Sequence, residues 1–163
     1  MPAAAIIEPP PDAEQFDSEA LWQQLTARAW RGQRVLVVRG DGGRDWLADR
    51  LREQGAEVAF VQAYRRTLPQ LDAPQRALLA SAVAAPASHC WLLSSSQAVD
   101  HLAQLAPQSD WSSGCAIATH PRIAATLRSR GFGSVLSVRP TLDAVVAAWT
   151  RSIQSMPASD QRP

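Results

Sequence analysis

Short apolar runs alternate with amphipathic stretches along most of the chain, and this pattern predicts alternating strands and helices. The run VLVV at 35–38 is entirely apolar, which is typical of a strand buried on both faces. The amphipathic stretches carry apolar residues three or four apart and end at glycine or proline. Predicted strands cover 35–38, 58–64, 90–93, 115–118 and 135–138; predicted helices cover 18–29, 44–54, 73–84, 97–105, 122–130 and 142–153.

Five strand–helix repeats after a leading helix predict an α/β fold, with parallel sheets flanked by helices and right-handed crossovers. Periodicity alone favours a single doubly wound sheet of five strands, of the flavodoxin-like type. The proline-rich start at 1–16 predicts an extended leader or linker, and the polar end at 156–163 predicts a flexible tail.

The composition of the chain excludes several classes of partner and of chemistry. The 163 residues are 46% hydrophobic and 19% charged, with a net charge of +1, so neither nucleic acid nor an anionic membrane is an expected partner. Every basic residue is arginine, which excludes lysine chemistry such as a Schiff base. No apolar run approaches ~18 residues and the start lacks the pattern of a signal peptide, so we expect a cytoplasmic protein.

The two cysteines, Cys90 and Cys115, lie in apolar runs that resemble strands. Such residues are usually reduced, buried thiols. A redox pair would require the two side chains to be adjacent in space, which a sequence does not reveal. The histidines and cysteines also lack metal-ligand spacing, so neither a metal nor a cofactor is expected.

Ligands of open α/β sheets bind beyond the carboxyl ends of the strands, so the loops at those ends are the candidate sites. The loop from Arg39 to Arg44 is rich in glycine and opens a helix, which suits an anion. It lacks a complete GxGxxG motif and a following lysine, so an ordinary tight turn is favoured over a nucleotide site.

Three further features have two interpretations each. The Ser94–Gln97 segment is either a helix cap with its turn or an anion site, and it lacks a GxSxG motif. His120 and Arg122 flank Pro121 at a strand-to-helix turn, where they either face a ligand or lie in solvent. Tyr64, the only tyrosine, lies at the end of a predicted strand, where it is either a packing residue or a proton donor.

Three segments in order resemble uroporphyrinogen-III synthases. VLVVRGDGGRDWLADRLREQGAEVAFVQAYRR resembles the family's strand–RGxGGR–helix–GAxV–strand–YxR segment, and DSEALW matches the helix that precedes it. WLLSSSQAVDHL resembles the strand–(S/T)S–helix turn, and CAIATHPRIAATLRSRGFGSVLSVRPTLDAVVAAW resembles the closing segment with its PT helix start. The resemblance covers about residues 17–150.

The resemblance implies a cofactor-independent hydro-lyase that closes linear hydroxymethylbilane to uroporphyrinogen III, with inversion of ring D and loss of water. It also implies two flavodoxin-like lobes, joined by a hinge and holding the substrate between them. Family chains are longer at the N-terminus, so 17–68 would form the C-terminal part of one lobe and 69–155 most of the second. We expect such a portion to be inactive or weakly active alone.

The resemblance further implies that Tyr64 is the weak general acid near the leaving hydroxyl. Substrate carboxylates would be bound at the strand-end loops by Arg39, Gly40, Gly43, Arg44, Ser94, Ser95, Ser96, Gln97, His120 and Arg122. The partners implied are the linear tetrapyrrole substrate and, transiently, the preceding enzyme of the pathway. A non-catalytic flavodoxin-like module that binds an anion or a partner protein is the alternative hypothesis.

Overall fold

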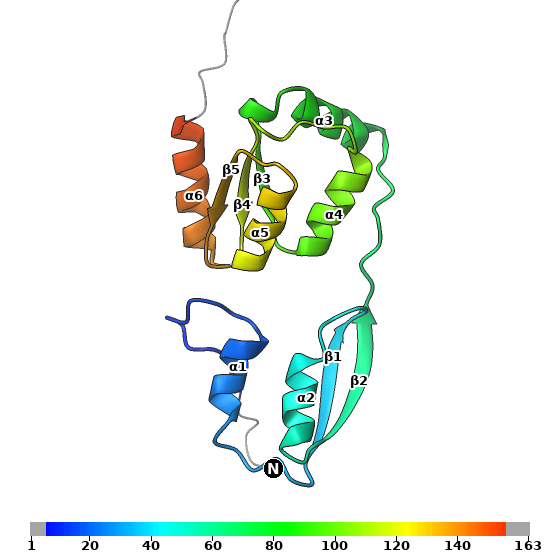
Figure 1. Ribbon diagram of the computed structural model, residues 1–163, viewed down its shortest axis with the longest axis vertical. Helices are drawn as coiled ribbons and strands as arrows, with labels where there is room; N and C mark the ends of the chain where they lie inside the picture. The colour runs from blue at the N-terminus through cyan, green and yellow to red at the C-terminus, as the bar shows by residue number, and fades with distance from the viewer. Residues whose placement is uncertain (1–5, 156–163) are drawn as a thin grey trace, which may run out of the picture. The chain divides into compact units, whose positions relative to one another are not determined.

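The strands of the computed structural model, which describes residues 6–155, form two separate parallel sheets (Figure 1). The α/β class with parallel sheets flanked by helices is therefore confirmed, whereas the single sheet of five strands predicted from periodicity is wrong. The first sheet contains β1 (Arg34–Gly40) and β2 (Glu57–Tyr64); the second contains, in this order, β3 (Cys90–Leu93), β4 (Cys115–Ala118) and β5 (Ser134–Ser137). The helices are α1 (Ser18–Leu25), α2 (Trp46–Glu53), α3 (Ala73–Ala84), α4 (Ser96–Leu105), α5 (Pro121–Ser129) and α6 (Leu142–Ser155), with a 3₁₀ turn, η1, at Pro86–Ser88.

The two sheets belong to two compact units, which divide between Thr67 and Leu68. Residues 6–16 of the predicted leader contain no helix or strand, and a turn is closed there by the bond from Ala13 N–H to the Pro10 carbonyl. The rest of that leader, 1–5, and the predicted flexible tail, 156–163, lie outside the described residues.

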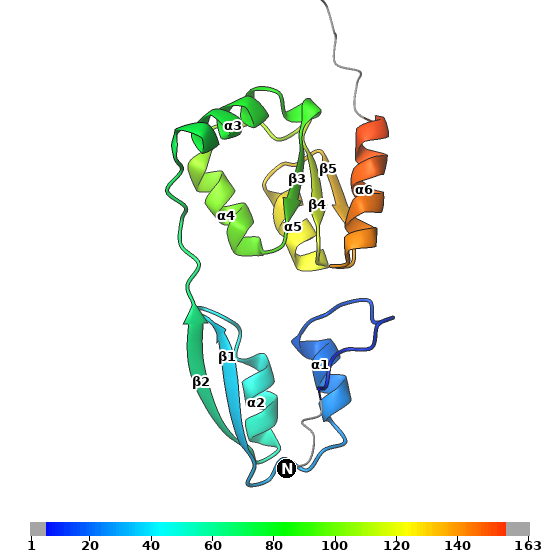
Figure 2. The ribbon, with the colours of Figure 1, turned by 180° about the vertical axis from the view of Figure 1, so that it is seen from behind.

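In the first unit, α2 covers one face of the β1–β2 sheet, and α1 packs against α2 (Figures 1 and 2). On β1, Val35 and Val37 are half-buried, whereas Leu36 and Val38 are 60% and 61% exposed. The prediction that VLVV is buried on both faces is therefore wrong. Successive side chains of a strand point to opposite faces, and α2 covers only one of them.

Local sequence signals determine where the helices begin. Asp72 and Gln75 form a reciprocal capping box at the start of α3, and the Asp17 carboxylate caps α1. Thr141 caps α6, since its hydroxyl accepts a hydrogen bond from the N–H of Ala144 at 3.4 Å. Helix α1 ends four residues before its predicted end, and there the indole N–H of Trp30 donates to the Leu25 carbonyl.

In the second unit, the sheet lies between α6 on one face and α4 with α5 on the other (Figures 1 and 2). The small residues Ala116 and Ala118 of the central strand let α5 approach closely, and Leu127 of α5 is completely buried. These residues belong to a hydrophobic cluster in which Trp111 stacks on Phe132, with ring centroids 4.9 Å apart. Trp91 packs against this cluster and makes an edge-to-face contact with Trp111, at a centroid distance of 5.6 Å. This cluster is the main core of the unit.

We expect Leu127→Ala to lower the free energy of unfolding by about 2–5 kcal/mol, because it leaves a cavity in this core. Leu78→Ala is the matched control: it makes the same change on α3, where the side chain is 67% exposed. Urea titrations followed by circular dichroism compare the two variants. Equal losses of stability would contradict the assignment of the core.

Candidate functional site

The aromatic ring of Tyr64 packs directly on Gly40, at the carboxyl ends of the two strands of the first unit. The two residues are register partners across β1 and β2, next to an irregularity between Arg39 and Gly40. A Cβ atom at position 40 would overlap Cε2 of the tyrosine and lie 2.7 Å from its Cζ. The tyrosine ring can therefore occupy this position only because residue 40 has no side chain.

The phenol of Tyr64 is half-exposed, and its oxygen accepts a hydrogen bond from Nη2 of Arg66 at 2.8 Å. The same guanidinium lies over the tyrosine ring, with Cζ 4.9 Å from the centroid. The Arg66 backbone N–H donates to Asp41 at 3.2 Å, and the other oxygen of that carboxylate pairs with Arg65 at 3.3 Å. These contacts tie the segment after β2 to the loop after β1.

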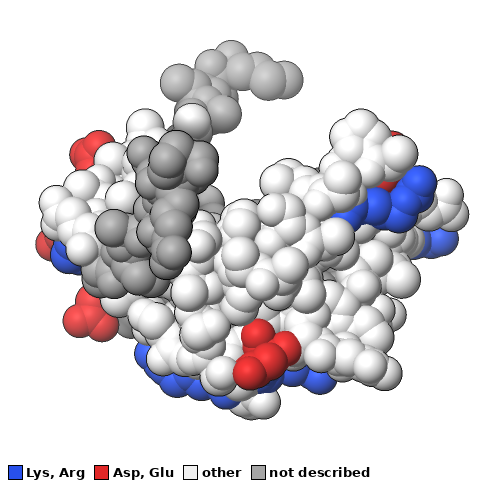
Figure 3. Space-filling model, turned by 90° about the horizontal axis from the view of Figure 1, so that it is seen from above, with Lys and Arg blue, Asp and Glu red and all other residues white. Residues whose placement is uncertain are grey.

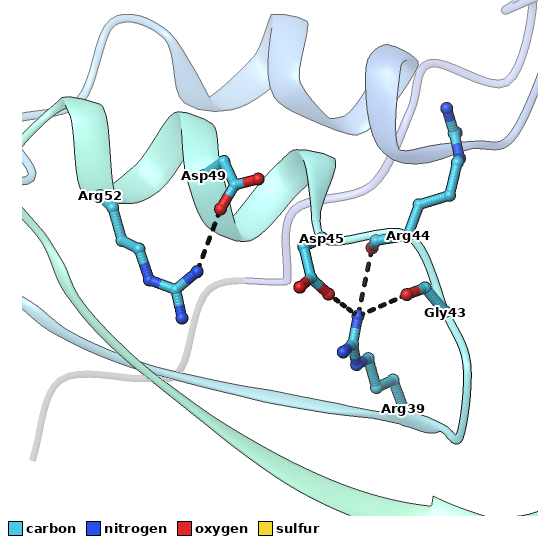
Figure 4. Close-up of polar contacts among 6 residues, drawn as sticks. All are labelled: Arg39, Gly43, Arg44, Asp45, Asp49 and Arg52. Carbon is cyan, nitrogen blue, oxygen red and sulfur yellow. Dashed lines mark hydrogen bonds and ion pairs between the residues drawn. The ribbon is translucent and has the colours of Figure 1, made fainter.

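Arg39 holds the glycine-rich loop in place (Figure 4). Its Nη1 donates to the carbonyls of Gly43 and Arg44 at 3.0 and 3.2 Å, and to Asp45 Oδ1 at 2.5 Å. Its guanidinium carbon also lies 4.2 Å from the centroid of the Phe60 ring. The positive charge of Arg39 thus organises the loop and faces a carboxylate of the same chain.

The Arg44 side chain extends away from that loop (Figure 4) and makes a bidentate pair with Glu19 of α1, at 2.8 and 3.0 Å. The hydrogen bond from Arg44 lowers the pKa of the Glu19 carboxyl, and the same bond raises the pKa of the arginine. Both side chains remain substantially exposed, so solvent screens the pair and its contribution to stability is small.

In the second unit, the predicted site residues lie at the starts of two helices. Ser95 caps α4 by accepting from the N–H of Ala98 at 3.1 Å. His120 caps α5, because its Nδ1 accepts from the N–H of Arg122 at 3.0 Å. Nδ1 is therefore unprotonated in this arrangement, which leaves the proton of a neutral imidazole on Nε2. The bond from Thr119 N–H to the Leu93 carbonyl, 3.3 Å, brings the two strand ends together.

Most of the face shown in Figure 3 is uncharged, and its few acidic and basic side chains lie mainly toward the rim. Within residues 6–155, no group of three or more histidine, cysteine or acidic residues is arranged to hold a metal ion. None of the helices in that range is long and apolar enough to cross a membrane.

Comparison with known proteins assigns the family. A model of the family described as uroporphyrinogen-III synthase HemD matches residues 9–147, which is most of the chain. The chain belongs to the uroporphyrinogen-III synthase family. The resemblance inferred from the motifs is thereby confirmed.

Two curated relatives of this family align with part of the chain. The uroporphyrinogen-III synthase of Salmonella typhimurium is 39% identical over 61 residues, which cover 37% of this chain and 25% of that protein. The uroporphyrinogen-III synthase of Escherichia coli is 38% identical over 61 residues, with the same two shares. The chain therefore matches only a quarter of the length of these uroporphyrinogen-III synthases.

The residues expected to act in the synthase family form one group in each unit. At the strand ends of the first unit, contacts join Tyr64 to Gly40, and Arg39 to the main chain of Gly43 and Arg44. The second group consists of Ser94, Ser95, Ser96, Gln97, His120 and Arg122, at the ends of β3 and β4.

Two residues that the sequence analysis left out of the site contribute to the first group. Arg66 contacts the phenol of Tyr64, and Asp41 binds both the N–H of Arg66 and the side chain of Arg65. Their positions just after strand ends could have identified them from the sequence. Asp41 is the first residue after β1 and Arg66 the second after β2, and both strand ends carry predicted site residues.

We expect Gly40→Ala to displace the Tyr64 ring and break its bond to Arg66, at a cost of about 1–3 kcal/mol in stability. Tyr64 is the only tyrosine, so protein labelled with 3-fluorotyrosine reports on this ring alone in ¹⁹F NMR spectra. The signal should shift in Gly40→Ala. Gly43→Ala is the control, because a Cβ there is at ordinary contact distance, 3.4 Å, from Arg39. An unchanged signal in Gly40→Ala would refute the packing described.

We expect Glu19→Gln to lower the free energy of unfolding by about 0.2–1 kcal/mol at neutral pH. Since the pKa of Glu19 is lowered in the folded state, the stabilisation is present above its unfolded pKa and is lost as pH falls through the folded pKa. The difference between wild type and variant should therefore disappear on acidification. Urea unfolding at a series of pH values measures it, with Glu57→Gln, at the start of β2, as the charge control.

Proposed function

We propose that this chain carries uroporphyrinogen-III synthase activity: cyclisation of hydroxymethylbilane to uroporphyrinogen III, with inversion of ring D and loss of water. The observation that carries the proposal is the family match over residues 9–147, which includes every residue of both groups. The reaction class is that of a hydro-lyase without a cofactor.

Tyr64 is proposed as the weak general acid that assists the departing hydroxyl of the bilane. Two contacts support this role. The ring is seated on Gly40, and Arg66 donates to the phenol oxygen, so the phenol's own proton must point in another direction. Half of the side chain is exposed, which makes the hydroxyl accessible to a ligand.

The propionate and acetate groups of the substrate are proposed to bind at the strand-end loops of the two units. In the second unit the suitable groups are the starts of α4 and α5 and the hydroxyls of Ser94 and Ser96, because helix N-termini carry partial positive charge. In the first unit they are the main chain at Gly40 and Gly43 and the cations Arg39 and Arg44.

The catalytic task is mainly conformational. Hydroxymethylbilane is already reactive and cyclises unaided to the wrong isomer, so the protein must hold ring D in the orientation in which its substituted carbon attacks. This explains why the proposed site needs no strongly activated nucleophile. We further propose a cytoplasmic location and transient transfer of the bilane from the preceding enzyme.

We expect the purified 163-residue chain, supplied with hydroxymethylbilane, to form uroporphyrinogen III only weakly, as a portion of a two-lobed enzyme would, yet measurably above the spontaneous background of isomer I. Tyr64→Phe, which keeps the ring and removes the hydroxyl, should slow formation of isomer III by roughly a hundredfold or more. Separation of uroporphyrins I and III after oxidation measures both outcomes.

Thr150→Val serves as the control, since it removes a hydroxyl from α6, outside both groups of site residues. Unchanged turnover in Tyr64→Phe would remove the phenol from the mechanism while leaving the activity assigned. Isomer I alone from the wild-type chain would overturn the proposed activity for this chain, and would favour the non-catalytic module that binds an anion or a partner.

A further inference from the structure

Cys90 and Cys115 are direct neighbours across β3 and β4 of the second unit. They are register partners in the parallel sheet, and their sulfur atoms lie 3.5 Å apart. Both thiols are free and half-buried on the face of the sheet that α6 covers. The Cys115 thiol donates to Ser152 Oγ at 3.4 Å, and the hydroxyl of Ser152 donates to the Ala148 carbonyl at 2.9 Å.

We infer that Cys90 and Cys115 are a redox-sensitive pair that forms an intramolecular disulfide linking β3 to β4. Adjacent strands lie ~4.8 Å apart, so directly paired residues fall within the Cα separation of about 4.4–6.8 Å that a disulfide requires. Rotation of the side chains must bring the sulfurs from 3.5 Å to bonding distance, and the backbone pairing is already in place.

Cys90 is the point of access for an oxidant. It lies on β3, an edge strand of the described sheet, and lines a groove of about 510 Å³ between α3, α4 and that strand. The groove is lined mainly by apolar side chains, among them Leu78, Leu79 and Trp91. Because Cys90 is only half-buried on this edge strand, a small reagent can reach it without separating the strands.

The oxidant that fits is a low-molecular-weight disulfide. The Cys90 thiolate attacks one of its sulfurs, forming a mixed disulfide and releasing one small thiolate. Cys115 then attacks the Cys90 sulfur, closing the bond between the strands and releasing the second small thiolate. The two protons lost by the protein thiols pass to the two leaving thiolates, and the two electrons reduce the small disulfide.

The surroundings of Cys90 make its oxidation slow. Burial, and then the hydrogen bond with Cys115, raise the pKa of the Cys90 thiol to about 11, so little of it is thiolate at neutral pH. The pair therefore remains reduced until an oxidant persists. The disulfide would then fix an edge strand to the central strand of its sheet.

The test is oxidation of the folded, full chain with oxidised glutathione, followed by intact mass spectrometry. The chain has only these two cysteines, so loss of two hydrogens from the monomer reports this bond alone. We expect that loss, and its reversal by dithiothreitol. Cys115→Ser is the matched control that should stop at a glutathione adduct on Cys90, whereas Cys90→Ser, which keeps only the thiol of the central strand, should react more slowly.

Urea unfolding of the oxidised and reduced chains gives a second measurement, since a bond compatible with the native geometry should raise the midpoint. A stable glutathione adduct on the wild type, disulfide-linked dimers, or thiols that stay free would each overturn the inference. A lower midpoint after oxidation would also overturn it, because it would show that the native pairing cannot accommodate the bond.

Discussion

Parallel pairing between consecutive strands is the constraint on which the rest of the structure depends. Because the paired strands of each sheet run in the same direction, their carboxyl ends meet at one edge of that sheet. In the first unit this places Gly40 beside Tyr64, and in the second it places the Leu93 end beside the Ala118 end. Residues far apart along the chain therefore share an edge, where the helix starts also lie.

The number of neighbours, rather than hydrophobicity, decides how deeply each strand is buried. In the three-stranded sheet, the central strand β4 has helices on both faces, and Ala116, Ile117 and Ala118 are almost completely buried. The VLVV run of β1 is more hydrophobic, yet Leu36 and Val38 are mostly exposed, since α2 is the one helix that covers this sheet among the described residues of its unit. An apolar run thus identifies a strand but not the layers around it.

The bounds of a helix or strand could be predicted from the sequence where residues close to its ends determine them. The bounds of α3, β3 and β4 agree with the predicted ones, because a capping residue, a proline or a short apolar run lies within a few residues of each end. The division into two sheets, the packing of Tyr64 on Gly40 and the adjacency of Cys90 and Cys115 depend on pairings between residues 19 to 25 positions apart. Such pairings leave no periodic trace. The same holds for Glu19, which binds Arg44 from a separate helix.

The two groups of site residues offer an anion different kinds of positive potential. In the first unit the guanidinium of Arg39 faces Asp45 and that of Arg44 faces Glu19, so an incoming carboxylate must share or replace an existing partner. In the second unit the first turns of α4 and α5 contain no acidic residue, so no carboxylate in either turn cancels the partial positive charge of the helix start. Exchange of one carboxylate for another changes the free energy little, whereas a carboxylate added to a helix start gains a new interaction. Under the proposed function, binding strength would therefore come mainly from the second group, and Arg39 and Arg44 would chiefly shape the loop that accompanies Tyr64.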